Sequence, residues 1–198
     1  MDLRAVKVPQ LHTKRLHLRG LRLEDAVAIS AYRSLPEVAK YQSWTKFGME
    51  EATQLIADQL AAKSAVAGSW VQLMIVLAES SQPIGDCGIH FPSNAPQQVD
   101  LGITLDPSYQ NRGFASEAIE GVLSYVFESL NMHRVSATTD AENKAAQNLF
   151  QRLGFRREAH FVEHLWFKGA WGSEYVFAML QREWQVRPNP HHSTSKII

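Results

Sequence analysis

The residues best suited to chemistry in this sequence form one continuous stretch, Gln110-Asn111-Arg112-Gly113-Phe114-Ala115-Ser116. An apolar strand pattern over residues 99–105 precedes this stretch, and a long amphipathic helix pattern follows it. The first turn of a helix leaves backbone N–H groups without partners and carries partial positive charge. Because Gly113 has no Cβ, the backbone can approach a ligand closely there. This order of strand, tight loop and helix predicts a site for phosphate or pyrophosphate.

The stretch differs from two other phosphate-binding loops. A P-loop requires Gly-x-x-x-x-Gly-Lys-Ser/Thr, and a dinucleotide fingerprint requires Gly-x-Gly-x-x-Gly. Neither pattern occurs in the sequence. Taken alone, the stretch has a simpler alternative interpretation, which is a plain strand-to-helix turn with glycine in a strained conformation.

The composition indicates one globular domain with a sizeable core. The chain has 198 residues, of which 45% are hydrophobic and 20% are charged, and its formal net charge is zero. Such a balance is ordinary for a folded domain of this size. We expect a single domain over residues 1–184 and a disordered tail over residues 185–198, which are polar and interrupted by proline.

Several classes of function lack their usual signal. There is no basic stripe, so nucleic acid is not an expected partner. No apolar run approaches the ~18 residues that span a bilayer, and no signal-peptide pattern opens the sequence, so we expect a cytoplasmic protein without a membrane partner. The single cysteine, Cys87, lies in an apolar run and is expected to be buried, with a reactive thiol as the alternative. We expect no metal, because His191 and His192 lack further ligands.

Hydrophobic periodicity predicts seven strands and four helices in one mixed α+β fold. The last predicted helix has Asn143 as its N-cap and Gly154 just past its end. Pro36 is expected to end the first helix. The predicted strands cover residues 15–19, 70–78, 83–91, 98–105, 134–139, 156–167 and 174–180, and the predicted helices cover residues 23–35, 49–64, 116–130 and 143–153.

Two segments together resemble the GNAT superfamily of N-acetyltransferases. The first is the Gln-x-x-Gly-x-Ala stretch, which resembles that family's acyl-CoA pyrophosphate loop. The second starts at Asn143 and ends in Leu153-Gly154-Phe155, and it resembles the family's other motif at the expected separation. The resemblance implies a mostly antiparallel twisted sheet of about seven strands, splayed at the acyl-CoA site, with helices on both faces.

Within the superfamily, the chain is most similar to the ribosomal-protein alanine N-acetyltransferases and their relatives. The segments that carry this similarity are Tyr41-Gln42-Ser43-Trp44, Asp100-Leu101-Gly102-Ile103 and Phe167-Lys168-Gly169-Ala170-Trp171. Tyr41, Trp44 and Trp166 are candidates to line the acceptor pocket, with packing in the core or at the rim as the alternative.

The resemblance implies that acetyl-CoA is the co-substrate and lies where residues 99–105 splay from residues 134–139. Backbone groups of Ile103 and Leu105 would bind the pantetheine arm, and the amides of Gln110, Asn111, Arg112, Gly113, Phe114, Ala115 and Ser116 would hold the pyrophosphate. The Arg112 side chain is either a further phosphate contact or a solvated surface residue. Asn143 and Phe150 are the further residues expected to bind the cofactor. Asn143 would reach the pantetheine or acyl end, act as the helix N-cap, or do both.

The catalytic residues of the nearest relatives are absent at the matching positions. Phe150 stands where many members have a tyrosine that protonates the leaving thiolate, Ala146 where others have serine, and Leu165 where the alanine acetyltransferases have glutamate. The candidate replacements are Asp100, Glu163 and His164, with His90 as a weaker option. Because Glu163 and His164 are neighbours on one strand, only one is expected to face the cleft. A purely structural or surface role is the alternative for each candidate.

The sequence therefore predicts acetyl transfer from acetyl-CoA directly to a primary amine, on a protein N-terminus or a small molecule. Direct transfer is expected because Cys87 lies in neither motif. A homodimer is a further expectation, since the family often dimerises. The missing hydroxyl groups leave a second hypothesis, a catalytically silent acyl-CoA-binding sensor or interaction module.

Overall fold

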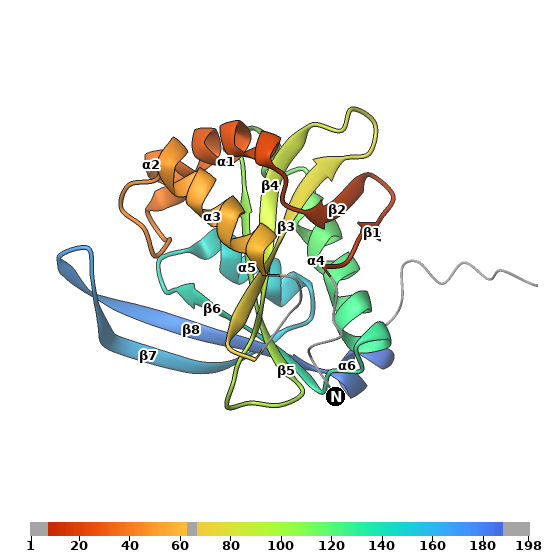
Figure 1. Cartoon of the computed structure of the whole chain (residues 1–198). Helices are drawn as coiled ribbons and strands as arrows, with labels where there is room; N and C mark the ends of the chain where they lie inside the picture. Colours follow the sequence, from red (N-terminus) through yellow and green to blue (C-terminus); the bar gives the residue numbers. More distant parts are fainter. Residues whose placement is uncertain (1–7, 63–66, 188–198) are drawn as a thin grey trace, which may run out of the picture.

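The protein is described here by a computed structural model that covers residues 8–62 and 67–187. An eight-stranded sheet forms its centre, in the order β1-β2-β3-β4-β5-β6-β8-β7 (Figure 1). All neighbouring strands are antiparallel except β5 and β6. The strands are β1 Leu11–His12, β2 Leu16–Gly20, β3 Ser69–Leu77, β4 Pro83–Phe91, β5 Gln98–Leu105, β6 Arg134–Asp140, β7 Arg156–Phe167 and β8 Ala170–Leu180. The predicted mixed fold is confirmed, and the strand beyond the predicted seven is the two-residue β1.

Helices cover both faces of the sheet, as predicted, because residues of the central strand β3 alternate between two cores. Leu73 packs with α4 and α5, whereas Met74 packs with α1 and α3. Figure 1 shows α1, α2 and α3 together on one side of β3 and β4, with α4 on the other. The helices are α1 Ala26–Arg33, α2 Pro36–Ala39, α3 Met49–Ala61, α4 Phe114–Ser124, α5 Lys144–Arg152 and α6 Gln181–Gln185. Among the described residues, no helix is long and apolar enough to cross a membrane.

Several predicted boundaries were wrong for local reasons. The first helix, expected over residues 23–35 and ended by Pro36, is α-helical only over Ala26–Arg33, and Pro36 instead begins the short helix α2, where its missing N–H is not needed. The helix α4 begins at Phe114, directly after Gly113, and passes into a π-helical turn over Tyr125–Ser129. The strand β8 begins at Ala170, because Lys168 and Gly169 form the hairpin turn with φ of 50° and 84°.

Two predicted chain segments lie partly outside the described residues. The second helix ends at Ala61 rather than residue 64, and residues 63–66 are not described. The predicted tail begins at residue 185, where the unpredicted helix α6 ends, and the guanidinium of Arg187 lies 3.7 Å from the carboxylate of Glu120. Residues 188–198 lie outside the description.

The sheet opens between β5 and β6, as the resemblance implied. These strands pair over only three residues, Gln98 with Arg134, Val99 with Val135 and Asp100 with Ser136. Beyond this short ladder, the two strands continue to Leu105 and Asp140 without pairing to each other. The sheet therefore has a seam, which we define as the divergence of β5 and β6 after Asp100 and Ser136.

A buried polar cluster fastens α1 to the sheet beside the seam. The carboxylate of Asp86 on β4 lies 2.6 Å from the Arg33 guanidinium and also accepts hydrogen bonds from Tyr32 and Gln72. Burial, followed by the negative charge of Asp86, raises the pKa of Tyr32 well above its ordinary value. The Arg33 guanidinium also lies over the Trp44 ring, 4.6 Å from its centroid. The cluster thus holds both α1 and the loop that follows α2.

Candidate active site

The loop before α4 presents a row of free backbone donors. Gly113 has φ of 80° and Asn111 has φ of 57°, both in the left-handed region. The six amides from Asn111 to Ser116 donate to no group within residues 8–62 and 67–187. The amide of Gln110 is already used, since it donates to the carbonyl of Pro107 at 3.2 Å. The anion site expected over residues 110–116 therefore narrows to residues 111–116, at the positive end of α4.

The side chain of Gln110 has a structural role in this loop. Its Nε2 donates to the carbonyl oxygen of Leu105 at 3.1 Å, which ties the loop to the end of β5. The backbone of Leu105 was expected to bind pantetheine, and its carbonyl oxygen is therefore already engaged by Gln110. Ile103, the other expected backbone partner, lines the pocket described below.

Three arginines lie around the free amides, and two of them were missed by the sequence analysis. Arg112, the predicted one, is exposed, with its guanidinium 5.2 Å from the Phe114 ring centroid. Arg15, on the turn before β2, donates to the carbonyl of Arg112 at 3.1 Å. Arg152, on α5, donates to the Ser116 hydroxyl at 2.8 Å. Arg15 and Arg152 are far from the loop in sequence, so their proximity to it depends on the tertiary structure.

Glu117 links the loop to the edge of the sheet. Its carboxylate lies 2.6 Å from the Arg15 guanidinium and accepts the Thr13 hydroxyl at 2.7 Å. Burial alone would raise the pKa of Glu117, but the hydrogen bonds from Thr13 and Arg15 outweigh it and lower the pKa. Glu117 therefore stays ionised and holds Arg15 beside the loop.

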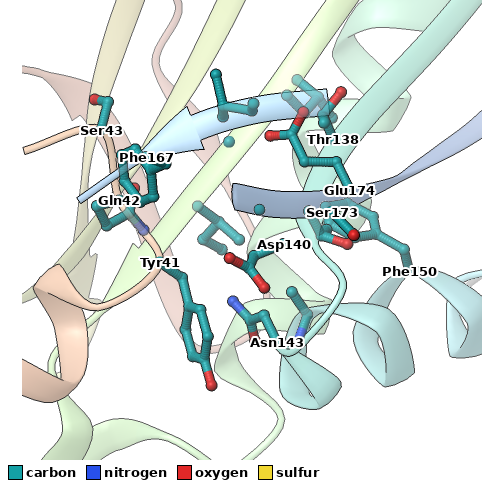
Figure 2. A pocket seen from close by; sticks show the side chains of 17 residues that line it. Tyr41, Gln42, Ser43, Thr138, Asp140, Asn143, Phe150, Phe167, Ser173 and Glu174 are labelled. Atoms are coloured by element: carbon teal, nitrogen blue, oxygen red, sulfur yellow. Dashed lines mark hydrogen bonds between the residues drawn. The ribbon is translucent and has the colours of Figure 1, made fainter. Parts of the chain in front are cut away.

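A pocket lies at the seam, between the diverging ends of β5 and β6 (Figure 2). The loop after α2, the start of α5 and the β7–β8 hairpin complete its walls. Its two ionisable acids are Asp140 and Glu174, and its lining contains no lysine, arginine or histidine within the described part of the chain. The lining residues are Tyr41, Gln42, Ser43, Leu101, Gly102, Ile103, Thr138, Thr139, Asp140, Asn143, Ala146, Phe150, Leu165, Phe167, Gly172, Ser173 and Glu174.

Asn143 and Phe150 both reach this pocket from α5. The Asn143 Oδ1 accepts the amide of Ala146 at 3.0 Å, which confirms the expected N-cap. Its Nδ2 donates to no group within the described residues and remains for a ligand. Phe150 is buried, with its ring centroid 5.2 Å from that of Phe155, so it forms an apolar wall rather than a proton donor.

Asp100, the first catalytic candidate, sits at the apex of the seam. Its carboxylate accepts the Ser136 hydroxyl at 2.6 Å and lies 3.1 Å from Nδ1 of His90. Asp100 lies just outside the pocket, two residues before Gly102 on the same face of β5.

The other two candidates, Glu163 and His164, occupy an irregular part of β7. The pairing with β8 shifts between Phe161 and Leu165, and Glu163 has φ of 44°. The simple alternation expected for these neighbours does not apply here, because it requires a regular strand. His164 lies against the pocket residue Glu174, with Nε2 3.1 Å from its carboxylate. Glu163 is exposed, and its amide donates to the Ser173 hydroxyl at 2.9 Å.

The three aromatic candidates have different outcomes. Tyr41 lines the pocket, as expected. Trp44 packs over Arg33 instead, and its indole N–H donates to the Arg33 carbonyl at 3.1 Å. Trp166 lies near the hairpin turn, 60% exposed, against Trp171. The sequence analysis missed Asp140 and Glu174 as pocket residues, because no local pattern distinguishes them from strand-end charges.

An open sheet with free helix amides beside a pocket at its seam is the architecture of an acyltransferase. Residues 15–156 match the family model described as the Acetyltransferase (GNAT) domain. The chain therefore belongs to the GNAT acetyltransferase family. It is 33% identical over 175 residues, 88% of this chain and 97% of the relative, to the uncharacterized N-acetyltransferase p20 of Bacillus licheniformis.

Two further comparisons bear on the group within the family. The [ribosomal protein uS5]-alanine N-acetyltransferase of Escherichia coli is 27% identical over 84 residues, 42% of this chain and 43% of that protein, which confirms the expected similarity. The structure of spermidine N-acetyltransferase from Vibrio cholerae, in complex with CoA and spermine, has the same fold. Its TM-score is 0.75 at 22% identity, and the match covers 87% of this chain and 99% of that chain.

Proposed function

We propose that this protein transfers an acetyl group from acetyl-CoA directly to a primary amine. The observation that carries the proposal is the row of six free amides, residues 111–116, beside the seam between β5 and β6. Such donors at the positive end of a helix suit a pyrophosphate, and an unpaired strand edge suits an amide-containing arm. Coenzyme A carries both groups on one molecule.

The donor would lie with its pyrophosphate on the amides of residues 111–116. Arg15, Arg112 and Arg152 surround these amides and would add positive charge toward the phosphates. The pantetheine arm would follow β5 past Ile103 into the pocket, where Nδ2 of Asn143 is free to donate. Phe150 would bound the acyl end with an apolar wall.

The acceptor would enter the same pocket as a positively charged amine. Asp140 and Glu174 contribute the carboxyl groups that line it, and their charge attracts an ammonium group. The similar proteins whose names give an acceptor act on an alanine of a ribosomal protein or on spermidine, and both acceptors carry amino groups. A protein N-terminus and a small amine are therefore the two acceptor classes to compare.

Direct transfer is favoured because the cysteine cannot serve as a nucleophile. Cys87 is fully buried, on the α4 side of β4, and burial raises the pKa of its thiol far above the ordinary value. A neutral, buried thiol neither reaches the acyl group nor attacks it. The tetrahedral intermediate would instead be stabilised by a backbone N–H on the splayed part of β5.

Calorimetric titration with acetyl-CoA tests the donor half. We expect Gly113→Ala to weaken acetyl-CoA binding at least about tenfold and Gly113→Glu to abolish it. Gly113 has φ of 80°, and a side chain there would be strained and would occupy space beside the amides of residues 111–116. Gly169→Ala is the matched control. Gly169 has a similar φ of 84°, but a Cβ added there would have no neighbouring atom within 4 Å among the described residues. Equal affinity for the wild type and Gly113→Glu contradicts the proposed site.

A second candidate, the silent acyl-CoA sensor, is favoured by one observation: the buried Phe150 and the small Ala146 offer no hydroxyl to the leaving thiolate. Thiol release from acetyl-CoA distinguishes the two functions, measured with n-butylamine, spermidine, lysine and an alanine-initiated peptide. Release with any amine supports the enzyme, whereas tight binding without release supports the sensor. The cytoplasmic location and the homodimer stay predictions.

A further inference from the structure

We propose that His90 accepts the proton of the acceptor ammonium, and that Asp100 and Ser136 are positioning residues that aim it. This inference rests on the proposed acetyl transfer and names the base that the reaction needs. An alkyl amine is mostly protonated at neutral pH and attacks a thioester only after losing a proton. The sequence analysis ranked Asp100 ahead of His90 for this task.

A row of four residues crosses four neighbouring strands at this point. Strand register places Trp70 opposite His90, His90 opposite Asp100, and Asp100 opposite Ser136. Residues directly opposite each other in a sheet share one face. The pair of Asp100 and Ser136 is also the last of the β5–β6 ladder, so the row ends at the apex of the seam.

Asp100 is engaged through both of its carboxylate oxygens. Oδ1 accepts the Ser136 hydroxyl at 2.6 Å, and Oδ2 lies 3.1 Å from Nδ1 of His90. A carboxylate only accepts hydrogen bonds, so the paired Nδ1 carries a hydrogen and neutral His90 has its lone pair at Nε2. In this arrangement Asp100 is not the base itself but the group that fixes the tautomer of His90.

Trp70 fixes the plane of the His90 ring. The two rings are stacked, with centroids 4.9 Å apart and planes inclined by 20°. Trp70 takes this position over Gly88, where a built Cβ would lie 2.8 Å from the indole. The glycine is therefore required for the stack, and the stack together with the Nδ1–Asp100 contact restricts the orientation of the His90 ring.

The pair is open enough to exchange protons with water. The side chains of His90 and Asp100 are 24% and 42% exposed. Gly102, on the same face of β5, lines the pocket, and we infer that a water would connect Nε2 of His90 with an amine bound there. Within the described residues, Asp100 on β5 is the titratable group in contact with His90, while β3 contributes the uncharged Trp70.

The ammonium gives one proton to Nε2, and the free amine nitrogen forms a bond to the thioester carbon while the carbonyl electron pair moves to oxygen. The intermediate collapses, the carbon–sulfur bond breaks, and its electron pair leaves on sulfur. The remaining excess proton on nitrogen passes to the thiolate. His90 returns its proton to water, and the products are the amide, the free thiol of CoA and one proton.

The test is the pH dependence of kcat/KM with acetyl-CoA and whichever of the four named amines is turned over fastest. We expect His90→Gln to lower kcat about 100-fold and to abolish the acidic limb of the profile. Asp100→Asn should lower kcat about tenfold and displace the limb, and Ser136→Ala should have a smaller effect in the same direction. His17→Gln on β2 is the matched control, because the His17 imidazole has no carboxylate partner among residues 8–62 and 67–187.

The affinity for acetyl-CoA, measured by calorimetry, should be equal in all four variants, which separates failure of this inference from failure of the donor site. The inference is overturned if His90→Gln keeps the acidic limb of the pH profile and a kcat within about twofold of wild type. This holds whether the acidic limb is then lost in Asp100→Asn or in His164→Gln. A second test uses the wild-type protein and therefore does not depend on the folding of any variant. Nitrogen-15 NMR at neutral or higher pH should show the hydrogen of His90 on Nδ1, and a hydrogen on Nε2 overturns the proposal.

Discussion

The guanidinium of Arg33 and the carboxylate of Asp86 form an ion pair at 2.6 Å, in which both side chains are buried between α1 and β4. Burying two charges costs several kcal/mol for each ion, and only close pairing with full hydrogen bonding offsets that cost. Here Tyr32 and Gln72 also donate to Asp86, and two aromatic rings cover Arg33. The pair specifies where α1 docks on the sheet.

Removing the charge of Asp86 should strongly destabilise the protein. Asp86→Asn leaves Arg33 buried without a counter-ion, and we expect the free energy of unfolding to fall by about 3–5 kcal/mol. Urea unfolding at neutral pH measures the change. The exposed pair of Arg22 and Glu24, at 3.6 Å, is the control, and Glu24→Gln should cost less than about 0.5 kcal/mol. Equal effects of the two substitutions would contradict this account.

The contribution of Glu158 to the stability of the protein should be lost at acidic pH. The hydrogen bond from Arg134, at 2.5 Å, and then that from Arg156 lower the pKa of Glu158 to about 2 from its ordinary 4.5. A group with a lowered pKa contributes stability above its unfolded pKa and loses it as pH falls toward its folded pKa. Glu158→Gln should therefore be less stable than wild type at pH 7, by at most about 1 kcal/mol because the pair is partly exposed.

This difference should shrink steadily as the pH is lowered from about 5 toward 2, where the carboxyl group of the wild type becomes neutral as well. Urea unfolding at a series of pH values measures it. A difference that stays constant over this range would show that the ion pairs of Glu158 contribute nothing to folding.

Cys87→Ala tests direct transfer. Because the thiol is buried and neutral, we expect kcat within about twofold of wild type and a stability loss of about 1 kcal/mol from the lost packing. A maleimide should label wild-type Cys87 in urea but not in the native protein. Loss of activity in Cys87→Ala at full acetyl-CoA affinity would point to an acyl-enzyme instead.

Substitution of Lys168 should affect binding of the acceptor amine without affecting binding of acetyl-CoA. Its ammonium, at the turn between β7 and β8, donates to the carbonyl of Ala39 at the end of α2, which joins two walls of the pocket. Lys168→Met should raise KM for the amine about fivefold, by loss of one such bond, and leave the affinity for acetyl-CoA unchanged. Lys46→Met is the control, because exposed Lys46 has no hydrogen bond within the described residues. An unchanged KM would show that this contact does not shape the pocket.

The donor half of the site could be predicted from the sequence because its signals are local. Gly113 and the helix after it lie within a few residues of each other, and Asn143 caps the helix that it begins. Strand patterns likewise identified the sheet: burial alternates along β2, β6 and the start of β5, whereas β3 and β4 are buried nearly throughout. These features depend on short-range geometry, which residue order fixes directly.

The proposed acceptor half could not be predicted, because the contacts between its residues depend on strand register. His90 meets Asp100, and Asp100 meets Ser136, only through pairings that a single strand pattern does not contain. The register shift in β7 likewise depends on its pairing with β8, and it removes the simple alternation expected for Glu163 and His164. Arg15 and Arg152 reach the anion loop from distant elements.

The seam between β5 and β6 has a mechanical consequence. A backbone ladder of three residue pairs joins the β1–β5 part of the sheet to the β6–β8 part. A bound coenzyme that contacts β5, α4 and α5 would act as an extra cross-link between these two parts. Hydrogen exchange of the β5 and β6 amides beyond Asp100 and Ser136 should therefore slow far more on acetyl-CoA binding than exchange in β3. The substrate would thus become a temporary structural member of the sheet, and each release of CoA would loosen it again.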